Sequence, residues 1–292
     1  ILIFTAACNR ATNPTPVGKA TETALHNPPA SSPTPVPPTP TMEPAAAFVN
    51  GEVISLKAYS EELERYLTDQ KALGKTPGGE EARQAVLTAL IDRTLLVQAA
   101  SKAGYQLPAA ELQKRLEALA TQMGGEQALA AWQTSHGYTP ETFEESLKAE
   151  AIAAWERDQL AAQVPTTAEQ VHVRQILVQD SQTAQKVVGQ LNSGTKFATL
   201  ALRYDPVTGG DLGWFPRGYL EDAQVEAAAF SLQPGQVSQV IQSEIGFHIL
   251  EVVERDPQRP LNTDQRLVLQ QKALQKWFDE TKSMSAIQVL VQ

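Results

Sequence analysis

Apolar residues recur with a helical period from residue 55 to about residue 163. The clearest stretch is 80–103, where the apolar side chains form one stripe and Gly104 follows as a stop signal. Before this region, AAFVNGEVIS places Asn50-Gly51 between two short apolar runs, which predicts a two-residue hairpin turn. The same spacing predicts further helices over 55–73, from Pro108, over 126–135, and from Thr139-Pro140 to about Gln163.

The pattern becomes mixed after Pro165. Alternating apolar positions predict a strand over 171–178, and two further strands are predicted at VSQVI and GFHILEVVE. The glycine-rich stretch GGDLGWFPRG bends sharply and adds another strand to the order. Helical spacing recurs over 181–192, 196–203 and 221–231.

The end of the chain carries a helix and a strand that lack a local partner. Asn262 begins a helix to about Lys282 with an apolar face, and SAIQVLVQ follows as a short strand. A two-stranded hairpin is marginal in water and leaves an edge that needs pairing. We therefore expect Ile287 to Val291 to lie beside the Val49 to Ile54 hairpin.

The predicted fold class is α+β. A helical domain, built from the N-terminal segment and the C-terminal helix, holds an inserted domain with a four-stranded antiparallel sheet and flanking helices. The predicted boundaries are 46–165 for the helical domain, 168–256 for the inserted domain, and 261–292 for the returning helix and strand.

Composition narrows the classes of function. The chain has 292 residues, 42% of them hydrophobic, which is enough for about two domains with their own cores. Its net charge is -9 and no segment is strongly basic, which argues against nucleic acid as a partner. The single cysteine excludes an internal disulfide and a cysteine-rich metal site, and we predict neither a metal nor a cofactor.

The first residues predict where the protein is located. ILIFTAAC resembles a bacterial lipobox, in which Cys8 becomes the lipidated first residue; Ala6 and Ala7 fit this pattern, and Thr5 departs from it. A plain signal peptide, or a chance run of small residues, is the alternative for 1–8. Residues 9–45 are rich in proline and threonine and predict a disordered spacer. Since no later stretch approaches about 18 apolar residues in a row, we expect an exported protein tethered to the outer face of a membrane.

The region from Val171 to Arg255 resembles the parvulin family of peptidyl-prolyl cis-trans isomerases. Five stretches carry the resemblance in family order: QILV, KFATLALRY, GGDLGWFPRG, AAAFSLQPGQVS and GFHILEVVE. The helical part, which opens with VNGEVIS and is closed by the C-terminal helix, more loosely resembles the chaperone domain of SurA and PrsA type foldases.

The resemblance implies an apolar pocket for a proline ring. Val225 stands where the family often has a larger side chain, and the preceding loop is longer, so a shallower pocket is expected. The pocket residues would be Leu212, Phe215, Leu220 and Val225, with Phe230 behind them.

The resemblance also implies a network of polar side chains, and this sequence departs from the family pattern there. His248 matches the second of two family histidines and Ser243 matches a hydroxyl position, but Gln175 stands where the first histidine is expected. Glutamine can donate and accept hydrogen bonds, yet it cannot shuttle a proton. His172 faces the other side of its strand unless a bulge intervenes. Asp205 is the candidate for a polar position facing the substrate, and a turn-forming acid before proline is an equal alternative.

Two functions follow from these residues. The first is an isomerase and folding helper for extended, proline-containing exported polypeptides, held at the membrane through Cys8. The alternative is a catalytically weak peptide-binding chaperone that retains the parvulin fold. His248 and the apolar residues favour the enzyme. Gln175 favours the alternative, as does the loop between Tyr204 and Gly209, which has four residues where the family usually has more.

Overall fold

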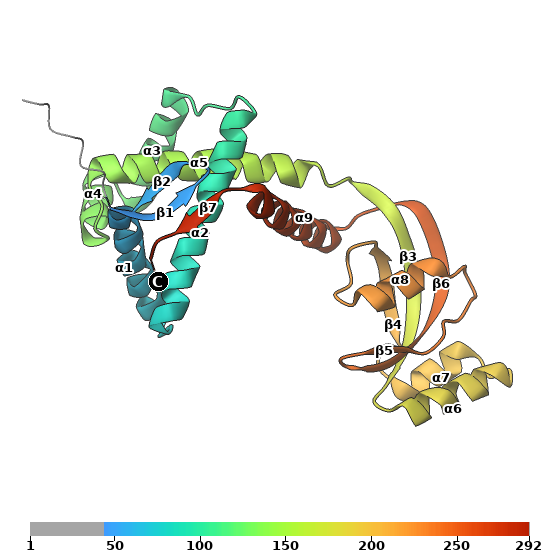
Figure 1. Cartoon of the computed structure of the whole chain (residues 1–292). Helices are drawn as coiled ribbons and strands as arrows, with labels where there is room; N and C mark the ends of the chain where they lie inside the picture. The colour runs from blue at the N-terminus through green and yellow to red at the C-terminus, as the bar shows by residue number, and fades with distance from the viewer. Residues whose placement is uncertain (1–43, 292) are drawn as a thin grey trace, which may run out of the picture. The chain divides into compact units, whose positions relative to one another are not determined.

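The computed structural model describes residues 44–291, so the predicted spacer up to residue 43 and the predicted lipidation at Cys8 lie outside the described residues. The chain begins with the hairpin β1 (Ala45–Val49) and β2 (Glu52–Ser55), shown in blue in Figure 1. Asn50 and Gly51 have φ values of 53° and 87°. Positive φ at both central residues is what a type I′ hairpin turn requires, so the predicted turn is confirmed.

Five helices follow the hairpin. Thr139 caps the last of them through its side chain and Pro140 occupies the first position, as predicted. Pro108 is instead the N-cap of its helix, because the extended ψ of 139° at this residue places it outside the helix. The bounds are α1 Leu56–Ala72, α2 Gly79–Lys102, α3 Ala109–Met123, α4 Glu126–Ser135 and α5 Pro140–Ala162.

The second sheet has four antiparallel strands in the order β4-β3-β6-β5. Two long strands, β3 (Thr167–Val178) and β6 (Gly246–Pro260), run side by side through its centre (Figure 1). The edges are β4 (Asp211–Pro216) and β5 (Ile241–Ser243). The predicted strand VSQVI is wrong except for its last residue, Ile241, which begins β5; Val237 makes only an isolated bridge to Glu251.

Both faces of the central strands are covered by helices. On one face, Val173 and Leu250 pack with α8 (Ala223–Ser231). On the other face, Ile176 and Ile249 pack with α6 (Ser181–Asn192) and α7 (Phe197–Tyr204). Neighbouring residues of β6 therefore serve opposite cores, as the period of two in a strand requires.

The chain then returns to the first sheet. Asn262 caps α9 (Thr263–Met284), and β7 (Ile287–Val289) pairs antiparallel with β1, giving the strand order β2-β1-β7. Trp277 of α9 and Ile287 pack against the core of the hairpin and of α2. The predicted α+β fold class, with the C-terminal helix joined to the helical part, is confirmed. The domain boundaries stay a prediction, and β6 continues to Pro260, past the predicted end at 256.

Two buried glutamines tie the start of α9 to the four-stranded sheet. Gln265 and Gln170 are 3% and 0% exposed, and the amide nitrogen of Gln265 donates to the side-chain oxygen of Gln170 at 3.1 Å. Gln265 also donates to the Trp214 carbonyl at 2.7 Å. Because buried amide groups need partners, this pair fixes the first turn of α9 against β3 and β4.

Candidate active site

His248 is the buried polar residue at the centre of the candidate site. It lies near the start of β6, is 4% exposed, and faces the same side of the sheet as Leu250, where α8 packs. A buried imidazole needs hydrogen-bond partners for both ring nitrogens.

Ser243 and Gln175 supply these partners from the two strands beside β6. The Ser243 hydroxyl lies 2.7 Å from Nε2 of His248, and the side-chain oxygen of Gln175 lies 3.1 Å from Nδ1. An amide oxygen only accepts, so the assigned geometry puts the proton on Nδ1 and leaves Nε2 to accept from Ser243. The amide nitrogen of Gln175 makes no hydrogen bond within residues 44–291.

Burial sets the charge of this histidine. Loss of hydration lowers the pKa of His248 below its ordinary value, and the nearby Asp222 carboxylate opposes part of that shift. His248 is therefore neutral at pH 7, and the network is made of uncharged groups.

The glycine-rich segment brings β4 close to Gln175. The Gln175 amide N–H donates to the Gly210 carbonyl at 2.8 Å. A Cβ atom on Gly210 would lie 2.0 Å from the Gln175 carbonyl oxygen, and φ at Gly210 is +70°. Only glycine can meet both conditions, which explains why the chain needs glycine at this point.

Asp205 serves its own loop. Its side chain accepts from the backbone amides of Val207 and Thr208 at 3.1 Å each, and also bonds the Thr208 hydroxyl. These hydrogen bonds, that of the Thr208 hydroxyl above all, lower the pKa of Asp205. None of its hydrogen bonds reaches His248, and the geometry is that of a turn-forming acid.

His172 is directed elsewhere. β3 has register shifts around Val173, yet the Nε2 atom of His172 lies 2.7 Å from Asp211 and its ring stacks on Trp214 at 5.5 Å. It is Gln175, at the position where the family pattern predicts the first histidine, that accepts the hydrogen bond from Nδ1 of His248.

The five predicted pocket residues belong to one apolar cluster on the face that carries His248. The Phe215 and Phe230 rings meet edge to face at 6.0 Å, and Phe215 is only 1% exposed. Val225 is also buried, which leaves Leu212 and Leu220 as the partly exposed members. The cluster is therefore mainly a core, and Leu212 and Leu220 form a small, partly exposed apolar rim at its edge.

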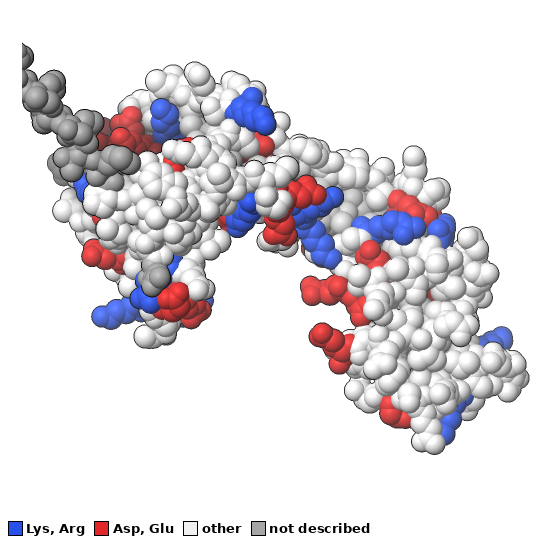
Figure 2. Space-filling model, in the orientation of Figure 1, with Lys and Arg blue, Asp and Glu red and all other residues white. Residues whose placement is uncertain are grey.

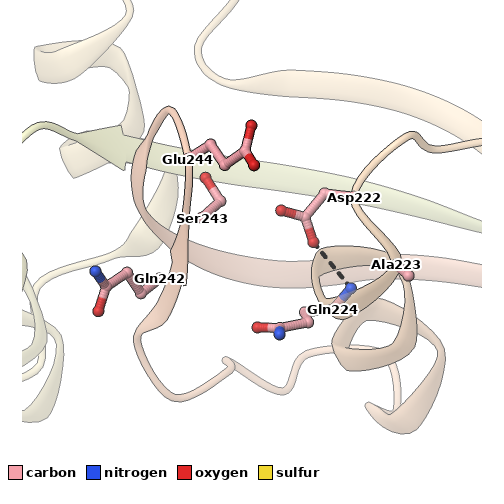
Figure 3. Close-up of a pocket in the computed structure, with 6 residues that line it drawn as sticks. All are labelled: Asp222, Ala223, Gln224, Gln242, Ser243 and Glu244. Carbon is pink, nitrogen blue, oxygen red and sulfur yellow. Dashed lines mark hydrogen bonds between the residues drawn. The ribbon is translucent and has the colours of Figure 1, made fainter.

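A hollow opens beside the buried histidine. One part, of about 470 Å³, is lined by Glu221, Asp222, Ser243, Glu244, Ile245 and His248. The adjoining part, of about 720 Å³, shares Asp222, Ser243 and Glu244 (Figure 3). The sequence analysis missed these acids. Asp222 had a signal, since an aspartate before AQVEAAAF is typical of a helix N-cap; Glu221 and Glu244 look like ordinary surface residues.

Comparison with known proteins identifies two regions of the chain. Residues 165–254 match the family described as PPIC-type PPIASE domain, and residues 38–154 match the SurA-like N-terminal domain. Both resemblances drawn from the sequence are therefore confirmed.

Two curated relatives are both called foldase protein PrsA. The one from Halalkalibacterium halodurans is 32% identical over 199 residues, which are 60% of this chain and 59% of that protein. The one from a Geobacillus species is 33% identical over 126 residues, covering 41% of this chain and 45% of that protein. The chain thus spans less than two thirds of these relatives. A solved structure, a peptidylprolyl isomerase (PrsA) from Bacillus cereus, is 24% identical to this chain and aligns with a TM-score of 0.48. The alignment covers 80% of this chain and 87% of the solved chain.

Proposed function

Because the chain contains a PPIC-type peptidyl-prolyl isomerase domain and a SurA-like domain, we propose that it is a peptidyl-prolyl cis-trans isomerase that helps client chains to fold. The observation that carries the proposal is the Gln175–His248–Ser243 network on the sheet face that also carries the apolar cluster. The network supplies polar groups and the cluster supplies an apolar wall, both on one side of the sheet.

The chemistry needs no nucleophile. Resonance opposes rotation about a peptide bond by about 18–20 kcal/mol, and X-Pro bonds isomerise over tens of seconds or more. Resonance places negative charge on the carbonyl oxygen, so an apolar wall disfavours the planar amide relative to the twisted one. Polar donors at the other end of the site can stabilise the twisted state. Lowering the barrier by about 4–6 kcal/mol accelerates the reaction about 10³ to 10⁴-fold.

Each residue of the network has a proposed part in this. Neutral His248 holds Gln175 and Ser243 in place, and the free amide donors of Gln175 bind the client backbone. Leu212 and Leu220 contact the proline ring at the open rim of the cluster.

An isomerisation assay on proline peptides with the full chain tests the proposal. We expect His248→Gln to lower the rate about tenfold or more, because preorganised hydrogen-bonding groups stabilise the transition state and His248 positions both Gln175 and Ser243. The matched control is His136→Gln at the C-cap of α4, outside the four-stranded sheet, which should retain the wild-type rate. A folded wild-type chain that accelerates no peptide would overturn the proposal.

The second candidate is a peptide-binding chaperone with little catalysis, and Gln175 favours it because an amide cannot exchange a proton as imidazole can. The two candidates separate on Gln175→His. For an enzyme limited by this position, the substitution should raise the rate. If the chain binds proline peptides but is inactive with either glutamine or histidine at position 175, the peptide-binding chaperone is supported.

We further propose that the protein works outside the cytoplasm on extended, proline-containing clients and is held at the membrane through Cys8. Within residues 44–291, none of the helices is long and apolar enough to cross a bilayer. Cys8→Ser should move the full-length protein from the membrane fraction to the soluble fraction in a host that processes lipoproteins. Unchanged fractionation would contradict lipidation.

A further inference from the structure

The hollow beside His248 is bordered by acids and by no basic side chain. Glu221 and Asp222 lie where the loop after β4 enters α8, and Glu244 lies at the turn between β5 and β6. Figure 3 shows Asp222 on one segment facing a loop that carries Ser243 and Glu244 side by side. Figure 2 shows acidic atoms on the edge of this domain that carries α8 and β5.

These carboxylates are not neutralised by the protein. Glu221 and Glu244 take part in no ion pair and accept no hydrogen bond among residues 44–291. Asp222 is in no ion pair there either, and accepts only from the amides of Gln224 and Val225 at the start of α8. The opposite case is Glu226, which is turned inward and accepts from two backbone amides of the loop.

The nearest basic residue in sequence is used elsewhere. The Arg217 guanidinium bonds Glu169 at 3.3 Å and lies over the Phe230 ring, 4.1 Å from its centroid. Arg255 bonds the same Glu169 at 2.8 Å. Both of these arginines are therefore paired away from the hollow. One lysine does lie near it, since the Lys272 ammonium donates to the Leu220 carbonyl at 2.9 Å, next to Glu221. The three carboxylates outnumber this single cation, so the hollow stays negative on balance.

The hollow lies next to the apolar cluster, because Leu220 of the cluster directly precedes Glu221 and Asp222 of the hollow's lining. Asp222 caps α8, and Val225 and Phe230 of that helix belong to the cluster. Neighbouring residues of a chain lie 3.80 Å apart between Cα atoms. A client that places its proline at the rim formed by Leu212 and Leu220 must therefore place an adjacent side chain in or beside the hollow.

We propose that Glu221, Asp222 and Glu244 select clients with a lysine or arginine next to the proline. This inference rests on the proposed function of the same site and adds its substrate class. A cationic side chain gains attraction from the three carboxylates, whereas a client glutamate meets repulsion and an uncharged residue neither.

The experiment uses peptides that differ only beside the proline, with lysine, glutamine or glutamate before it in one series and after it in another. Isomerisation rates and binding of fluorescently labelled peptides are measured with the full chain. We expect kcat/KM for the lysine peptide to exceed that for the glutamate peptide by about three- to tenfold at low salt, as for exposed charge pairs. At 1 M salt, where the screening length is about 3 Å, the ratio should approach one.

The variant Glu221→Gln/Glu244→Gln should bring the lysine-to-glutamate ratio close to one. The control is Glu254→Gln, which removes one carboxylate at an exposed position of β6, six residues after His248 and about 20 Å from it at 3.3 Å per residue. It should leave the ratio unchanged. If the double variant does not fold, the salt dependence of the wild-type ratio gives the same test.

The outcomes separate the two proposals. Isomerisation without a preference for lysine, or with a preference that the double variant keeps, overturns the charge selection and leaves the isomerase in place. Binding that prefers lysine without any isomerisation supports the charge selection and overturns the enzyme. If the chain neither isomerises nor binds any of these peptides, both proposals are overturned.

Discussion

At the scale of single residues, the site depends on a histidine that the fold keeps neutral. Both ring nitrogens of His248 are occupied, by Ser243 and by Gln175, and the side chain is 4% exposed. A second proton would place a charge among buried groups and remove the acceptor that faces Ser243. The network is therefore stable only while His248 is uncharged.

This predicts how stability changes with pH. The pKa of His248 is lowered in the folded state, so the folded chain binds fewer protons than the unfolded one below about pH 6.5, the ordinary histidine value. The stabilisation is fully present above about pH 6.5 and is lost as the pH falls through the lowered folded-state value. Thermal unfolding of wild type and His248→Gln between pH 7.5 and 5 measures it. We expect the wild type to lose more stability than the variant, and parallel curves would contradict the assignment.

At the scale of elements, the glycine-rich loop links a strand pairing to the position of Gln175. Gly210→Ala places a Cβ 2.0 Å from the Gln175 carbonyl oxygen, so the backbone must move. Gly213→Ala is the matched control, because Gly213 also has a positive φ of 68° but no atom within 4 Å of the added Cβ. The control should lower the free energy of unfolding by about 1–2 kcal/mol, because alanine is strained in the left-handed backbone conformation.

Gly210→Ala should cost at least about 2 kcal/mol more than the control, in the range of changes that break packed contacts, and should also lower the isomerisation rate. Urea denaturation followed by circular dichroism measures the first effect, and the peptide assay measures the second. Equal losses for the two variants would show that the close approach to Gln175 has no energetic role.

The elements also show what local sequence can predict. Helix limits followed from side chains that act on their own backbone, such as Thr139 and Asn262, and both cap as expected. The site was harder, because its geometry depends on partners distant in sequence. The family pattern located Gln175 and His248, which are 73 positions apart, but not the hollow beside them. For Asp205, a turn and a substrate contact need the same residue before proline, so the sequence could not separate them.

At the scale of the whole molecule, the chain closes its first sheet with its last strand. Val49 pairs with Ile287, and the Asn50 side chain bonds Ser285 and Ala286, more than 230 positions later. Ile287 also packs on the core formed by the hairpin and α2. The PPIase domain is thus contained between two segments that belong to one folding unit.

Deleting residues 285–292 should therefore destabilise the helical part, although the deleted residues lie at the far end of the sequence. Loss of the strand exposes the edge of β1 and the apolar contacts of Ile287 and Val291, which should cost about 2 kcal/mol or more. The four-stranded sheet should be unaffected, because Gln265, which ties α9 to it, is retained. Hydrogen exchange resolved by residue measures both regions in one chain.

Two point variants in the same strand make this prediction specific. Ile287 faces the core and Gln288 is exposed, so Ile287→Asp should reproduce the loss and Gln288→Asp should not. The reason is that successive strand residues face opposite sides, and only the first of these two carboxylates would be buried against apolar side chains. Faster exchange in β1 for Ile287→Asp alone is the expected result. Equal effects of the two variants, or a deletion that changes exchange only within the four-stranded sheet, would contradict a unit closed by β7.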